Sequence, residues 1–240
     1  MARVGIIQTG GIGDIVIALP IAAWFADRGD TVFWPIDDRW LTFFAAAAPY
    51  ATFLPVPSGM NRSPTDPKAY PVTLPAAALQ ANNVDRSCML YSAMRDVRIE
   101  NEKYSQHLKF DEYKYAVSGV PFDEKWNLRI DRDLHREETF FRSLGIKRQF
   151  ICMHRKSFNF KLDIDPPPEW TKNYDIVDID ERTASPFDWL LTIERASKLV
   201  CIDSCFANLV EQLNLRTEKF LALRTPHLNT PVFKNGWTFV

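Results

Sequence analysis

The sequence has almost no imbalance of charge. With 29 Lys and Arg against 30 Asp and Glu, its formal net charge is -1, so the whole chain lacks the positive field that attracts nucleic acid or an anionic membrane. Long apolar runs at the N-terminus are lacking too, because MARVGIIQTG is too short for a signal peptide or a membrane span. These absences predict a cytoplasmic protein that holds any charged ligand with a local cluster of side chains.

Paired metal-binding cysteines and the common nucleotide-binding motifs are also missing. The four cysteines lie in or beside apolar runs and form no C-x-x-C pair, which favours reduced, buried thiols over a zinc site. The glycine-rich stretch GGIGD (10–14) lacks both the Lys-Ser/Thr ending of a P-loop and the G-x-G-x-x-G spacing of a dinucleotide fingerprint. A Rossmann-type oxidoreductase is therefore disfavoured, and the lone acid Asp14 needs another explanation.

The chain does contain alternating strands and helices in both halves. The expected strands are short apolar or β-branched runs at 3–9, 30–36, 51–56, 86–92, 149–154, 174–180, 198–203 and 218–223. The expected helices lie between them, at 15–26, 39–48, 132–147, 185–196 and 204–215. This βαβ rhythm predicts an α/β fold with mostly parallel sheets. We place an N-terminal domain at 1–135 and a C-terminal domain at 136–240.

Three further segments carry a structural expectation. Residues 57–73 are rich in Pro, Ser and Asp without periodicity, which predicts a long surface loop. The charges between 95 and 115 balance, which is typical of a solvated helical face. In the helix at 185–196 we expect Ser185 to be the N-cap and Asp188 to complete a capping box.

The turn after the first expected strand is the first candidate site. Gly11 and Gly13 precede or flank a helix start, where backbone N–H groups can hold a phosphate or stabilise a carboxylate. Asp14 lies at the same helix start, beside the edge of the sheet at which such folds bind ligands. Its two interpretations, a helix cap and a functional acid, are about equally good from the residues alone.

Two more candidate sites follow strands of the second half. In MHRKSFNFK, the cations His154, Arg155, Lys156 and Lys161 gather around Ser157, which is typical of a phosphate clamp and also of a solvated basic loop. In CIDSCFAN, Asp203 and Ser204 end a strand and open a helix, so they are either N-cap residues or part of a diphosphate site.

An alternating pair of acids, Asp178 and Asp180, superficially resembles a D-x-D metal motif. Because the two acids alternate at the end of an expected strand, we interpret them as strand-end residues rather than as metal ligands.

At this point the sequence resembles glycosyltransferase family 9, the heptosyltransferases of lipopolysaccharide assembly. The opening GIGDIVIALP is similar to the family's strand, Gly-Asp turn and helix with a proline six residues on. FICMHRKSFNFK looks like the segment that contacts the donor phosphates, with Ser157 and Lys161 at the matching places, and residues 174–214 are similar throughout. The resemblance implies a GT-B fold, in which two Rossmann-like domains face a cleft.

The resemblance also implies a chemistry. A nucleoside-diphosphate sugar would be the donor, held by Gly11, Gly13, Ser157, Lys161, Asp203, Ser204 and Asn208. The acceptor hydroxyl, on a glycan, a lipid-linked sugar or another molecule, would attack with inversion while Asp14 takes its proton as general base. No metal and no cofactor are expected in this scheme.

The sequence departs from the family pattern in the second domain. The glycine and histidine of its Asp-Ser/Thr-Gly-x-x-His motif are Cys205 and Asn208 here, and only a short segment separates Lys161 from Tyr174. We therefore expect a compact protein with a trimmed C-terminal domain. Two alternatives stay open: an inactive nucleotide- or sugar-binding protein of the same fold, and a transferase acting on a hydroxylated base in DNA, which the net charge does not support.

Overall fold

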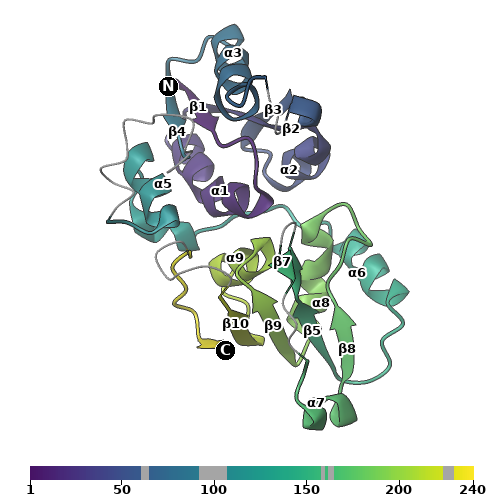
Figure 1. Cartoon of the computed structure of the whole chain (residues 1–240). Helices are drawn as coiled ribbons and strands as arrows, with labels where there is room; N and C mark the ends of the chain where they lie inside the picture. Colours follow the sequence, from purple (N-terminus) through teal and green to yellow (C-terminus); the bar gives the residue numbers. More distant parts are fainter. Residues whose placement is uncertain (61–64, 92–106, 158–159, 162–164, 224–229) are drawn as a thin grey trace. The chain divides into compact units, whose positions relative to one another are not determined.

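The structure, a computed structural model of the 240-residue chain, describes residues 1–60, 65–91, 107–157, 160–161, 165–223 and 230–240. It divides into two units, Met1–Asp131 and Arg132–Val240, whereas the sequence analysis placed the division after residue 135. Each unit has a parallel sheet covered by helices (Figure 1). None of the helices in these ranges is long and apolar enough to cross a membrane.

The first unit is built on a four-stranded sheet of order β3-β2-β1-β4 in which all neighbours are parallel. Its elements in chain order are β1 (Arg3–Ile7), α1 (Ile12–Asp27), β2 (Thr31–Asp37), η1 (Asp38–Trp40), α2 (Leu41–Ala47), β3 (Ala51–Val56), η2 (Ser58–Met60), η3 (Ala69–Thr73), α3 (Leu74–Ala81), β4 (Arg86–Met89), α5 (Phe110–Ser118) and η4 (Phe122–Trp126).

Helices pack on both faces of this sheet, with α1 and α3 on opposite sides of it (Figure 1). Leu79 of α3 forms a buried cluster with Ile7 and Phe33 on one face. Gly5 allows this close packing, because a Cβ there would lie 2.6 Å from Cδ1 of Leu79. The helix α1 is apolar nearly all round and buried from Ile15 to Ala23, as expected for a helix between a sheet and further helices.

The second unit has a five-stranded parallel sheet of order β11-β10-β9-β5-β8. Its elements in chain order are α6 (Leu134–Ser143), β5 (Phe150–His154), β6 (Lys156–Ser157), β7 (Phe160–Lys161), α7 (Pro168–Asn173), β8 (Asp175–Asp178), η5 (Pro186–Trp189), α8 (Leu190–Arg195), β9 (Lys198–Ile202), α9 (Cys205–Gln212), β10 (Glu218–Ala222) and β11 (Trp237–Phe239). The short strands β6 and β7 form an antiparallel hairpin beside this sheet.

The core of the second unit also lies on both faces of its sheet. Ile151, Met153 and Val200 form a buried cluster against which Trp170 of α7 packs. A charged network fixes the start of the unit, since Arg132 donates to both Glu137 of α6 and Glu194 of α8. The two sheets and their helices therefore confirm the expected α/β fold with two Rossmann-like units.

Several local expectations were wrong. The expected loop at 57–73 contains the η2 turn and the π-helix η3. In the 95–115 segment, residues 95–106 lie outside the described range, and α5 is not a solvated face because Asp111 and Lys114 are 0% and 2% exposed. Asp188 completes no capping box, since its carboxylate accepts hydrogen bonds from Arg136 and Thr183. Ser185 is the N-cap as expected and accepts from the Phe187 N–H at 3.3 Å.

Candidate functional site

The strand order of the first unit places GGIGD at a topological switch point. From β1 the chain crosses to β2 on one side, while β4 lies on the other side of β1. In open parallel sheets, ligands bind outside the carboxyl ends of the strands where the connections diverge in this way. Asp14 follows β1 at this edge, and Leu90 and Tyr91 follow β4 beside it.

Asp14 does not cap helix α1. The N-cap position is Gly11, and Asp14 lies in the first turn with its side chain 37% exposed. Its Oδ1 pairs at 3.0 Å with Nζ of Lys114, a side chain that is only 2% exposed. The cap interpretation is therefore wrong, and Asp14 is a half-exposed carboxylate held by a buried ammonium group.

The backbone of the turn is fixed by a phenol. The hydroxyl of Tyr91 accepts hydrogen bonds from the Thr9 N–H at 2.8 Å and the Gly10 N–H at 3.0 Å. Burial raises the pKa of Tyr91, and the two backbone N–H donors oppose that shift without cancelling it. Gly11 has a φ of 80°, and a Cβ on it would lie 2.4 Å from Oδ2 of Asp14. The turn thus needs glycine both for its backbone and for room beside the carboxylate.

A buried acid supports the turn from the β2 side. Asp37 ends β2, is 0% exposed and accepts hydrogen bonds from Arg39 and from the hydroxyl of Tyr70 at 2.6 Å. Burial acts to raise the pKa of Asp37, but the hydrogen bonds from Arg39 and Tyr70 outweigh it and the pKa is lowered. The Tyr70 ring lies against Gly10. Asp37 therefore stays ionised at neutral pH and holds the ring that closes this side of the turn.

The second unit has a pocket of about 750 Å³ at the carboxyl edge of its own sheet. Here too the strand order has a switch point, between β5 and β9. The lining residues come from the end of β5, the β6–β7 hairpin, the segment before α7, the end of β8 with the turn after it, and the start of α9. They are His154, Arg155, Lys156, Lys161, Asp165, Asp178, Ile179, Asp180, Glu181, Arg182 and Phe206.

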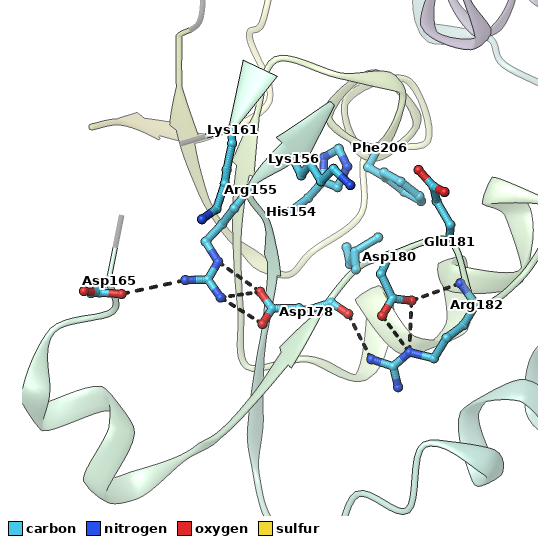
Figure 2. Close-up of a pocket in the computed structure, with 11 residues that line it drawn as sticks. His154, Arg155, Lys156, Lys161, Asp165, Asp178, Asp180, Glu181, Arg182 and Phe206 are labelled. Atoms are coloured by element: carbon cyan, nitrogen blue, oxygen red, sulfur yellow. Dashed lines mark hydrogen bonds and ion pairs between the residues drawn. The ribbon is translucent and has the colours of Figure 1, made fainter. Parts of the chain in front are cut away.

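The arginines of this pocket are engaged by its acids (Figure 2). Arg155 donates to Asp178 at 2.7 Å and lies 3.8 Å from Asp165. Arg182 donates to Asp180 at 2.8 Å. The two acids of the D-x-D pattern, Asp178 and Asp180, are thus each paired with an arginine. The described residues contain no cluster of metal-ligating side chains. The cations on the hairpin are Lys156 and Lys161, whose Cα atoms are cross-strand partners.

A histidine and a serine join β5 to the start of α9 at the back of the pocket. Nδ1 of His154 lies 2.9 Å from Oγ of Ser204, and the thiol of Cys201 lies 3.5 Å from the same oxygen. The His154 ring packs edge-on against Phe206 at 4.8 Å. Ser204 occupies the N-cap position of α9, but its side chain makes no capping hydrogen bond. The capping interpretation of Ser204 is therefore wrong, and its hydroxyl bonds the histidine.

The other sequence-predicted donor residues differ in exposure. Lys161 is exposed and lines the pocket, while Asp203 is 4% and Asn208 3% exposed. Nδ2 of Asn208 donates to the Ser204 carbonyl at 2.9 Å, and its Oδ1 has no partner within the described parts of the chain. The backbone of Ser157 is in β6, and its side chain lies outside what the structure describes. Gly11 and Gly13 are in the other unit, Gly11 as the N-cap of α1 and Gly13 in its first turn.

Sequence reasoning missed the residues that hold Asp14 and the turn, chiefly Lys114 and Tyr91. Lys114 shares one helical face with Asp111, Tyr115 and Ser118, at the spacing i, i+3, i+4 and i+7, and all four are buried. That spacing was the available signal. It was hidden because charged residues are ordinarily taken as solvated.

Comparisons of the sequence give no match to a known family model or to a curated protein. Solved structures do match. A family 9 glycosyltransferase from Veillonella parvula DSM 2008 has a TM-score of 0.64 at 10% identity, covering 100% of this chain and 86% of that one. ADP-heptose lipopolysaccharide heptosyltransferase II of E. coli has a TM-score of 0.54 at 9% identity, covering 99% and 92%. The dodecameric iron-containing glycosyltransferase TibC of enterotoxigenic E. coli has 0.54 at 13%, covering 92% and 57%.

These structures span nearly the whole of this chain, including both of its parallel sheets. At such low identities the likeness establishes the fold. The chain therefore has the two-unit α/β fold of the family 9 glycosyltransferases.

Proposed function

We propose that the protein is a glycosyltransferase that moves a sugar from a nucleoside-diphosphate donor to an acceptor hydroxyl, with Asp14 as general base. One observation carries the proposal. In a fold shared with solved family 9 transferases, Asp14 has a partly exposed carboxylate at the switch point of the first sheet. The pocket at the switch point of the second sheet, which has Lys156 and Lys161 in its lining, supports it as the donor site.

The proposed reaction is a single displacement with inversion. The acceptor oxygen attacks the anomeric carbon, the bond from that carbon to the diphosphate oxygen breaks, and the diphosphate leaves with the electron pair. Oδ2 of Asp14 accepts the acceptor's proton as the new bond forms, because a neutral alcohol is a poor nucleophile. Asp14 suits this role because its carboxylate is partly exposed while Lys114 fixes its other oxygen.

The leaving diphosphate gains negative charge, which the second unit would stabilise. Lys156 and Lys161 on the hairpin line the pocket and bring two positive charges to it. We assign the phosphates to the two lysines and to the backbone N–H groups at the start of α9. Ser157, Asp203, Ser204 and Asn208 complete the proposed donor set of the second unit, and Gly11 and Gly13 are the donor residues proposed in the first unit. The scheme uses no metal and no cofactor.

The test is release of the nucleoside diphosphate from a panel of nucleotide sugars, with and without candidate acceptors. Replacing Asp14 by Asn keeps the shape of the side chain and removes the base, so we expect turnover to fall about 10²- to 10⁴-fold with donor affinity unchanged. Asp27→Asn is the matched control, since Asp27 lies on the same helix with a 54% exposed side chain. Full turnover in Asp14→Asn contradicts the base role, and donor binding without turnover in the wild type favours an inactive binding protein.

A further inference from the structure

We infer that Lys114 is a positioning residue for Asp14, which fixes one carboxylate oxygen so that the other alone accepts the acceptor's proton. The inference rests on the proposed function and adds to it a residue from α5, far along the sequence from Asp14. It comes from the contacts of a lysine that is only 2% exposed inside the first unit.

The Lys114 ammonium group is held by two hydrogen bonds and one ion pair. Nζ lies 2.7 Å from Oε1 of Gln8, 3.0 Å from the carbonyl oxygen of Leu90 and 3.0 Å from Oδ1 of Asp14. Two hydrogen bonds are thus donated to Gln8 and Leu90, and the charge of the ammonium group pairs with Asp14. A buried charge is costly unless it is paired and hydrogen-bonded in this way.

The three partners of Lys114 belong to the three segments that form the switch point. Gln8 follows β1, Leu90 follows β4, and Asp14 is in the first turn of α1. Lys114 therefore joins both strand ends to the helix start from a single atom. A displacement of Asp14 requires breaking its ion pair with a buried ammonium group, which would leave that charge without its carboxylate.

The arrangement makes the two oxygens of Asp14 unequal. Oδ1 is bound to the ammonium group, whereas Oδ2 lies beside Gly11, where a Cβ would be only 2.4 Å away. Glycine at this position leaves room at Oδ2. The base is thus held in one orientation before a substrate arrives, and such preorganisation matters because a misplacement of about 1 Å costs about 10²-fold in rate.

The test is a double-mutant cycle of Lys114→Met and Asp14→Asn, with turnover and thermal unfolding both measured. We expect Lys114→Met to lower kcat about 10- to 100-fold with the donor KM changed less than about twofold, since only the acceptor's proton transfer is affected. In the Asp14→Asn background, the same substitution should lower kcat no further, because there is no base left to position. Lys114→Gln, which is neutral but keeps polar groups, serves if Lys114→Met does not fold.

The matched control removes a different lysine–aspartate pair, between Asp111 of α5 and Lys125 of η4. Asp111→Leu with Lys125→Met replaces a pair in which both side chains are 0% exposed, and it should leave kcat unchanged. Full kcat in Lys114→Met, or an equal further loss in the Asp14→Asn background, overturns the inference. An inactive wild type overturns the proposed function instead. In that case the contact itself is still tested by whether the effects of the two substitutions on thermal unfolding are non-additive.

Discussion

At the residue scale, the sequence identified a candidate site residue where a residue type is unusual for its surroundings. It could not identify residues whose role depends on a partner that is distant in the sequence. Asp14 could be singled out because a lone acid follows three glycines in an apolar segment. Its partner could not, because Lys114 lies a hundred residues away and reads like any charged residue of a helix. Ser204 was correctly placed at a helix start. Its hydroxyl bonds His154 at the end of β5 instead of a backbone N–H of the helix, and this contact depends on how the strand and the helix pack.

A prediction at this scale concerns Gly11. Substitution by Ala places a Cβ 2.4 Å from Oδ2 of Asp14 at a backbone φ of 80°, so we expect a loss of about 1–3 kcal/mol in the free energy of unfolding and a fall in turnover of about 10²-fold. Urea unfolding and diphosphate release measure the two effects.

Gly29→Ala is the control for this prediction. Gly29 has a φ of 83°, and a Cβ there meets nothing within 4 Å. It should lose comparable stability and keep full turnover. If the two variants are equally active, crowding at Oδ2 has no functional consequence and this part of the account is wrong.

At the element scale, strands with apolar runs were predictable, and elements that depend on partners were not. The expected strands at 51–56 and 198–203 coincide with β3 and β9 to within a residue. The β6–β7 hairpin is too short to leave a periodic pattern. Helix α7 begins within a run of prolines and was not among the expected helices. Helix α5 was misjudged because its buried face carries charges that are paired inside the unit.

A prediction at this scale concerns how α5 is held to η4. Nζ of Lys125 lies 2.6 Å from Oδ2 of Asp111, with both side chains 0% exposed. Lys125→Met leaves a buried carboxylate without its cation, so we expect the free energy of unfolding to fall by about 3–5 kcal/mol in urea titrations. Combining it with Asp111→Leu removes the buried carboxylate as well and should restore most of that loss. A single variant as stable as the wild type contradicts the buried-pair description.

At the scale of the whole molecule, the alternation of strands and helices was enough to predict two α/β units, and the resemblance to family 9 transferases agrees with the solved structures. The strand order was not predictable, although it decides where the switch points lie. Two pairs of parallel neighbours are distant in sequence, β1 with β4 and β5 with β9. Only the folded sheets therefore show that GGIGD and MHRKSFNFK each lie at a switch point.

The central claim is that the second unit binds a nucleoside diphosphate through its hairpin lysines, and calorimetric titration of the intact protein tests it most directly. ADP, GDP, UDP and CDP would each be titrated in EDTA into the wild type, Lys161→Ala and Lys172→Ala, the last being an exposed lysine of α7 outside the pocket. We predict that one diphosphate binds, that Lys161→Ala weakens it about 10- to 100-fold through loss of a charge-assisted contact, and that Lys172→Ala does not. Binding of no diphosphate, or equal binding by Lys161→Ala, contradicts the account.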